Sequence, residues 1–153
     1  MEYREYGSSG DVLSIVAFAG IVVSNETSED SDRYVSWAID QGINYFDVAP
    51  SYGNAQNMLG PALEPYRKDV FLACKTNKRD ARTAQAELEE SLRLLRTDHF
   101  DLYQLHAMSS EEDLEIATGP GGALEVLVRA RDAGKIRHLG FSAHSAEVAI
   151  ELM

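Results

Sequence analysis

The chain has 153 residues, of which 44% are hydrophobic and 25% are charged, so it has the length of one domain and enough apolar content for a buried core. Its 14 Lys and Arg against 25 Asp and Glu give a net charge of −11. An acidic surface of this kind repels nucleic-acid phosphates and anionic lipid, which argues against both as partners. The single cysteine, Cys74, excludes an internal disulfide and a cysteine-based metal site.

The N-terminal residues interleave acidic and basic side chains and contain no apolar stretch typical of a secretory signal. The longest apolar run, residues 15–23, is too short to cross a bilayer. Together with the acidic charge, these features predict a cytoplasmic protein that has no nucleic-acid partner and no membrane partner.

Short apolar runs alternate along the chain with segments of helical spacing. Residues 3–14 predict a small hairpin around a turn that contains Gly7 and Gly10. Strand-length runs follow at 15–23, 45–46, 70–74, 100–105 and 136–141. Several of these runs lack strict alternation, which is typical of parallel strands covered on both faces.

Helices are predicted between these runs, at 28–42, 54–67, 83–96 and 122–133, and from 145 onward. Ser28 is the expected N-cap of the first helix, and Gly42 its C-terminal stop. We expect Pro61 to break or kink the second helix, because proline has no amide hydrogen to donate. In the third helix, Ala84 and Leu88 lie on one apolar stripe.

Strand and helix alternate with a period of about 30 residues, which is the pattern of βα units in a parallel sheet. These units fit either an open doubly wound sheet or part of a (β/α)8 barrel. A complete barrel typically has about 250 residues, so a barrel built from this chain is partial. We expect residues 1–153 to form a single domain.

Candidate catalytic side chains stand where the predicted strands end. Active sites of both architectures lie at the carboxyl ends of their parallel strands. Asp47, Lys75 and His106 end three successive predicted strands, and Tyr52 lies in the loop after the first of them. A lysine ammonium lowers the high pKa of a tyrosine, and an aspartate holds that lysine in place. With a histidine to orient a carbonyl oxygen, this set can protonate the oxygen while a hydride reaches its carbon.

Each of these residues also has a purely structural interpretation. A lysine at a strand end is commonly a solvated surface charge. A tyrosine beside glycine in a turn more commonly packs against neighbouring side chains than takes part in catalysis. A histidine beside an apolar strand is commonly a hydrogen-bonded core residue. The functional interpretation rests on three successive units that place such groups at one end. The spacing of His138 and His144 does not indicate a metal site.

Five stretches resemble the aldo-keto reductase family: residues 42–53 (GINYFDVAPSYG), 73–76 (ACKT), 88–92 (LEESL), 101–106 (DLYQLH) and 134–142 (GKIRHLGFS). The resemblance implies an α/β fold of the (β/α)8 TIM-barrel type, of which about the first five βα units are present after an N-terminal β-hairpin. It also implies NADP(H) or NAD(H) as the cofactor, a small carbonyl compound as the substrate, and no metal.

By position, the resemblance assigns a catalytic tetrad to Asp47, Tyr52, Lys75 and His106. Tyr52 would be the general acid, Lys75 with Asp47 would tune it, and His106 would position the carbonyl. Three positions match cofactor contacts of the family: Gly20, Asp47 and Ser142.

The sequence departs from the family's pattern at several points. Ala143 stands where many members carry an asparagine as a second contact to the nicotinamide carboxamide. Pro61 interrupts the usual Leu-Gly-x-Ala-Leu helix, and residues 17–20 (AFAG) hold less glycine than is usual. The sixth to eighth strands of the barrel, with most of the loops that hold the dinucleotide, are missing from these 153 residues.

These observations leave three interpretations open. One is an NAD(P)H-dependent oxidoreductase that reduces aldehydes and ketones to alcohols, with weak or no turnover in this chain alone. The alternative is a non-catalytic half-barrel that serves as an interaction or oligomerisation module; an open-sheet binding protein unrelated to the barrel is a third interpretation. A partial barrel leaves its first and fifth strands as open edges, which pair readily with another chain, so we expect a homo-oligomer.

Overall fold

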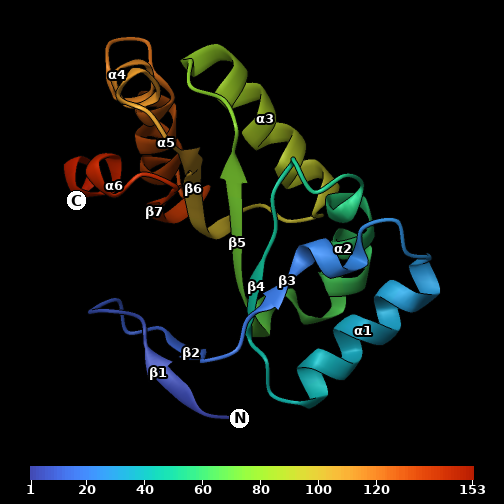
Figure 1. Cartoon of the computed structure of the whole chain (residues 1–153). Coiled ribbons are helices and arrows are strands. Elements are labelled where there is room, and N and C mark those ends of the chain that lie inside the picture. The colour runs from blue at the N-terminus through green and yellow to red at the C-terminus, as the bar shows by residue number, and fades with distance from the viewer. The chain divides into compact units, whose positions relative to one another are not determined.

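The computed structural model describes residues 1–153 (Figure 1). Its strands are β1 (Tyr3–Glu5), β2 (Val12–Ser14), β3 (Phe18–Ala19), β4 (Tyr45–Asp47), β5 (Phe71–Thr76), β6 (Phe100–Met108) and β7 (Ile136–Ala143). Its α-helices are α1 (Ser28–Asp40), α2 (Ala55–Leu63), α3 (Ala81–Leu94), α4 (Glu111–Thr118), α5 (Ala123–Asp132) and α6 (Ala146–Leu152). Two 3₁₀ helices, η1 (Gly20–Val23) and η2 (Glu64–Asp69), complete the set.

The strands form a hairpin and one parallel sheet. β1 and β2 pair antiparallel, with Tyr3 opposite Ser14, and the other five strands form a sheet in the order β3-β4-β5-β6-β7. The predicted hairpin and the predicted order of parallel strands are therefore confirmed, and the fold is α/β of a partial TIM-barrel type. The residues group into two compact units, one of residues 1–73 and 94–97 and one of residues 74–93 and 98–153.

The first strand of the sheet is much shorter than predicted. The run at 15–23 was expected to be extended throughout, but β3 ends at Ala19 and the chain continues as η1. Gly20 lies so close to the next strand connection that an added Cβ would stand 2.8 Å from Val48 Cβ. The chain turns directly after this close approach, with Ser24 N donating to Ile21 O at 3.0 Å.

Helix α1 forms where its sequence predicts, with a different cap. Thr27, not Ser28, is the N-cap, and its Oγ1 accepts a hydrogen bond from Asp30 N at 3.0 Å. Gly42, at φ 81°, ends the helix in the left-handed conformation that glycine adopts without strain. The apolar face turns inward and buries Val35 fully.

Helix α2 runs through the proline that was expected to break it. Pro61 lies within α2, and η2 follows directly after Leu63. Gly60 allows the helix to lie directly against the segment at 94–97, because an added Cβ would stand 2.1 Å from Leu94 O. Of the predicted break or kink, the break is wrong, and a kink stays a prediction. The burial of Leu59 and Leu63 in this helix shows how tertiary packing overrides the loss of one hydrogen bond.

Helices α3, α5 and α6 of the second unit follow the predicted pattern, whereas α4 was not among the predicted helices. α3 begins at Ala81, slightly before its predicted start, because Asp80 Oδ1 accepts from Thr83 N at 3.0 Å. Its predicted stripe is buried, including Ala84 and Leu88. Ser145 caps α6 by accepting from Val148 N at 3.3 Å.

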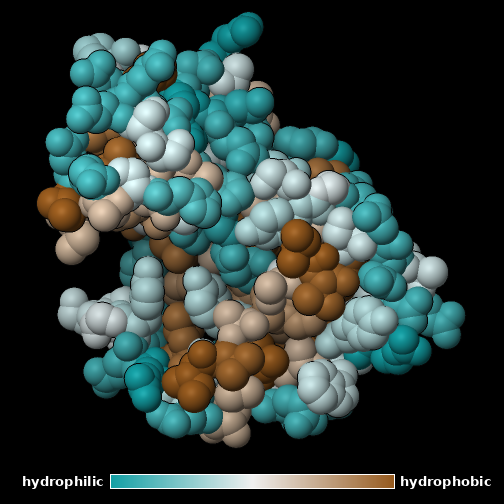
Figure 2. All heavy atoms as spheres, in the orientation of Figure 1, coloured by the Kyte–Doolittle hydropathy of each residue, from teal (hydrophilic) through white to brown (hydrophobic).

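Apolar surface remains exposed on the first unit. In Figure 2 the hydrophobic surface gathers over the segment from β2 through β3 to η1, and Ile15, Val16, Ile21 and Val22 are each at least 50% exposed. Between β3 and α1 lies an open, apolar cavity of about 500 Å³ that Phe18 and Trp37 line. None of the helices has the combination of length and apolar content that a membrane span requires.

Candidate functional site

The structure places the expected residues near the carboxyl ends of successive strands. Asp47 is the last residue of β4, Lys75 is next to last in β5, and His106 lies close to the end of β6. Ser142 is next to last in β7. Tyr52 lies in the loop between β4 and α2. The predicted placement along each strand is therefore found; the assembly of these residues into one site stays a prediction.

Within the first unit, Gly20 lies against the end of β4. An added Cβ at Gly20 would stand 3.0 Å from the carbonyl oxygen of Asp47. Asp47 is held in register between Ala19 of β3 and Ala73 of β5. The lack of a side chain at Gly20 is thus required for the approach of the two backbones at this strand end.

Tyr52 is carried by a tight turn in the same unit. Tyr52 N donates to Ala49 O at 3.1 Å, and Tyr52 O accepts from Ala55 N at 3.1 Å. Gly53 completes the turn at φ 59°. The half-buried Tyr52 side chain is therefore positioned by main-chain bonds to both the strand connection and the start of α2.

Two other tyrosines, Tyr45 and Tyr103, have phenols whose pKa is raised. Burial, with a smaller contribution from the Asp47 carboxylate, raises the pKa of Tyr45 to about 12. Burial likewise raises the pKa of Tyr103 well above its ordinary value. Neither phenol is suited to act as a general acid near neutral pH, because efficient proton donation needs a pKa close to the working pH.

In the second unit, the chain leaving β5 is fixed by a glutamate of α3. Glu87 Oε2 accepts from Thr76 Oγ1 and from Asn77 N, both at 2.7 Å. Lys75, directly before this clamp, is only 5% exposed. A buried ammonium is costly unless polar groups surround it. The alternative interpretation, in which Lys75 is only a solvated surface charge, is therefore wrong.

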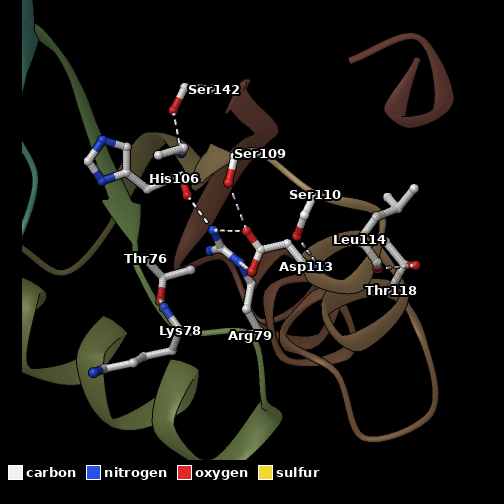
Figure 3. Close-up of polar contacts among 11 residues, drawn as sticks. Thr76, Lys78, Arg79, His106, Ser109, Ser110, Asp113, Leu114, Thr118 and Ser142 are labelled. Atoms are coloured by element: carbon white, nitrogen blue, oxygen red, sulfur yellow. Dashed lines mark hydrogen bonds and ion pairs between the residues drawn. The ribbon is translucent and has the colours of Figure 1, made fainter. Parts of the chain in front are cut away.

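His106 is held at two points by the segment that follows β5. Its ring nitrogen Nδ1 lies 2.8 Å from Asn77 Oδ1. Its carbonyl oxygen accepts from Arg79 Nη2 at 2.7 Å, as Figure 3 shows. Ring and main chain of His106 are thus fixed by different residues of one short segment.

Arg79 also connects this segment to α4. Its Nε lies 3.1 Å from Asp113 Oδ1, and its side chain is 15% exposed. Hydrogen bonding to this guanidinium lowers the pKa of Asp113 below its ordinary value. Asp113 is itself fixed at the start of α4, where its N–H donates to the capping Ser110 Oγ at 3.1 Å (Figure 3).

Ser142 lies beside the end of β6. Its Oγ accepts from Ala107 N at 2.9 Å, where the register between β6 and β7 shifts. Ala107 takes φ 53° there, an uncommon conformation for a residue with a Cβ. Because the hydroxyl accepts the Ala107 bond, its own hydrogen can still donate to a further acceptor. That hydrogen is suited to an amide oxygen such as the one of a nicotinamide carboxamide.

Sequence reasoning missed Asn77, Arg79, Glu87 and Asp113. A signal was present for the first two, because they directly follow a strand whose end was already singled out. The other two lie on helices, where a charged residue on the polar face normally indicates only solvent exposure. No group of three or more His, Cys, Asp or Glu side chains is placed to hold a metal ion.

Comparison with known proteins identifies the family. The model of the aldo/keto reductase family matches residues 22–153. The aldo-keto reductase YhdN of Bacillus subtilis (strain 168) is 34% identical over 96% of this chain and 48% of its own length. The 6-dehydroglucose reductase of Novosphingobium aromaticivorans is 30% identical over 92% of this chain and 51% of its own length.

A solved structure gives the same result. The holo form of aldo-keto reductase AKR11C1 from Bacillus halodurans superposes with a TM-score of 0.85 at 27% identity, over 99% of this chain and 53% of that one. The chain therefore spans about half the length of the relatives it matches. With the family model covering most of its residues, the chain belongs to the aldo/keto reductase family.

Proposed function

We propose that this chain carries the proton-transfer half of an NAD(P)H-dependent carbonyl reductase. One observation carries the proposal: Asp47, Lys75 and His106 occupy the carboxyl ends of β4, β5 and β6, neighbours in one parallel sheet. In such sheets these ends share one edge. Family membership supports oxidoreductase chemistry on carbonyl compounds.

Each proposed catalytic residue has a distinct task. Tyr52 donates a proton to the carbonyl oxygen, and the Lys75 ammonium stabilises the tyrosinate that forms. Asp47 keeps Lys75 charged, and His106 holds the carbonyl oxygen toward the phenol. The dinucleotide, when bound, supplies a hydride to the carbonyl carbon. General acid catalysis of this kind contributes about 10² to 10⁴ in rate.

The proposed cofactor is NADP(H) or NAD(H), and the proposed substrate is a small aldehyde or ketone. Gly20 and Asp47 would lie beside the nicotinamide ring, and the Ser142 hydroxyl would donate to its carboxamide. The support is the membership of the family and the available hydrogen of the Ser142 hydroxyl. The matched relatives are about twice as long as this chain, so cofactor residues beyond it are part of the proposal.

The domain, location and assembly belong to the same proposal. We propose that residues 1–153 form one partial barrel domain that associates as a homo-oligomer. The exposed apolar segment from β2 to η1 supports association, because large apolar patches are seldom left uncovered on monomers. The buried Cys74 thiol forms no disulfide, which is typical of a reducing compartment and supports a cytoplasmic location.

The apolar cavity between β3 and α1 favours a second function. A non-catalytic half-barrel would use this surface to bind another chain and would keep the tetrad without using it. The cavity of about 500 Å³, lined by Phe18, Tyr34 and Trp37 among others, is the observation in favour of such an interaction module. Cofactor binding separates the two functions, since a module that binds no dinucleotide cannot transfer its hydride.

The test measures cofactor binding and turnover on the same preparations. NADPH and NADH are titrated by nucleotide fluorescence, and reduction of a simple aromatic aldehyde is followed by loss of NADPH absorbance. For a reductase we expect Tyr52→Phe to remove turnover and to leave dinucleotide affinity nearly unchanged. Tyr66→Phe, in η2, is the matched control and keeps both. Absence of dinucleotide binding in the unmodified chain would favour the interaction module, and full turnover in Tyr52→Phe would assign the proton to another group.

A further inference from the structure

The contact between His106 and Asn77 has a chemical consequence beyond packing. A neutral imidazole carries one N–H, so the partner of one ring nitrogen decides whether the other nitrogen donates or accepts. Here Nδ1 faces the side-chain amide of Asn77 at 2.8 Å. The other nitrogen, Nε2, is the atom that a carbonyl oxygen would meet in the proposed reaction. The Asn77 amide therefore acts on the chemistry at Nε2 from the opposite side of the ring.

The main chain around this contact is fixed on both sides. Glu87 Oε2 accepts from Asn77 N at 2.7 Å, and Arg79 Nη2 donates to His106 O at 2.7 Å. The Asn77 side chain makes no hydrogen bond through its Nδ2 in this structure. The backbone is thus held while the amide can turn about its Cβ–Cγ bond, which exchanges Oδ1 for Nδ2 at the same place.

We propose that Asn77 is a positioning residue whose amide orientation is coupled to which nitrogen of the His106 imidazole carries the hydrogen. This inference rests on the proposed reductase function. With Oδ1 facing Nδ1, as here, the ring donates from Nδ1 and Nε2 accepts. With the amide turned, Nδ2 donates to Nδ1, and the ring hydrogen lies on Nε2, where it is donated to a carbonyl oxygen.

An amide at this position matters because, unlike a carboxylate, it is uncharged. A carboxylate only accepts, so it would hold the hydrogen on Nδ1, and its negative charge would favour the protonated imidazolium. Arg79, which donates to the His106 carbonyl oxygen, is itself paired with the Asp113 carboxylate (Figure 3). Asn77 adds no charge, so the ring can stay neutral and still have a defined partner.

The experiment follows the ring nitrogens directly. Long-range ¹H–¹⁵N correlation spectra of the full chain report the protonation of Nδ1 and Nε2 across pH, with His106→Gln assigning the signals. In Asn77→Asp we expect the neutral ring to carry its hydrogen almost wholly on Nδ1, and its pKa to rise by about one unit or more. Where the chain turns over, the same variant lowers kcat and leaves the KM for the dinucleotide nearly unchanged.

Lys78→Gln is the matched control. It changes the net charge by the same amount one residue away, and Figure 3 shows the Lys78 side chain pointing away from the imidazole. We expect Lys78→Gln to leave the tautomer as in the unmodified chain. Asn77→Ser provides a second variant, because it removes the amide without adding charge and must change the tautomer populations.

The possible outcomes are distinct. Unchanged ring signals in both Asn77 variants would overturn the proposal, as would equal shifts in Asn77→Asp and Lys78→Gln. The spectra need no cofactor, so they report on Asn77 whether or not the chain turns over. Changed ring signals together with no dinucleotide binding would count against the reductase function and not against the coupling of Asn77 to His106.

Discussion

Replacing Gly60 with alanine isolates the packing of α2 from its helix propensity. An added Cβ would stand 2.1 Å from Leu94 O and 2.9 Å from Leu95 Cα, and both of these atoms belong to backbone that cannot rotate away. In an exposed helix the same substitution stabilises by about 1 kcal/mol. Overpacking of a close contact costs about 1 to 3 kcal/mol, and more where backbone must shift. We therefore expect Gly60→Ala to lower the free energy of unfolding by about 1 to 2 kcal/mol.

The measurement is thermal and urea unfolding followed by circular dichroism. A loss of this size lowers Tm by about 2 to 8 °C for a chain of this length. Asn57→Ala is the matched control, because Asn57 is exposed on the same helix and its replacement tests propensity alone. We expect that control to gain a few tenths of a kcal/mol. A Gly60→Ala chain as stable as the unmodified one would show that α2 does not lie against the 94–97 segment as closely as described.

Three further predictions concern pH and assembly. Arg79 lowers the pKa of Asp113, so the ionised carboxylate stabilises the fold above its ordinary pKa of about 3.9. This stabilisation is lost as pH falls through the lowered pKa. Asp113→Asn should be less stable than the unmodified chain at neutral pH, and urea unfolding should show the difference closing below about pH 4. Burial raises the pKa of Tyr45 to about 12, so its neutral form stabilises the fold below about pH 10. This stabilisation is lost as pH rises from about 10 toward about 12. Tyr45→Phe should lose less stability over that pH range, and absorbance titration of the variant should show one fewer phenol that ionises late. Light scattering at micromolar concentration should give a dimer or larger species, and a stable monomer would contradict the proposed assembly.

The elements of the fold could be predicted because their signals are local. The stripe of Ala84 and Leu88 in α3 and the stop at Gly42 each act through spacing or backbone freedom within a few residues. The errors arose where distant packing decides. β3 is cut short beside Val48, and α2 continues through Pro61 because its buried face is held by the rest of the unit.

The candidate site shows the same division. The ends of the apolar runs predicted that Asp47, Lys75 and His106 stand near strand ends, and the structure places them there although β6 continues to Met108. The tight turn at Tyr52 also follows from its sequence, since Gly53 supplies the positive φ.

The residues that hold His106 could not be predicted in the same way. Asn77 and Arg79 contact it only because the chain turns after β5 and brings them against the end of β6. Glu87 fixes that turn from α3, eleven positions along the chain from Thr76. A periodicity argument gives the face on which Glu87 lies but not the loop that it reaches. The sequence pattern therefore locates the proposed proton-transfer groups, while the three-dimensional path of residues 77–79 determines how the ring and main chain of His106 are held.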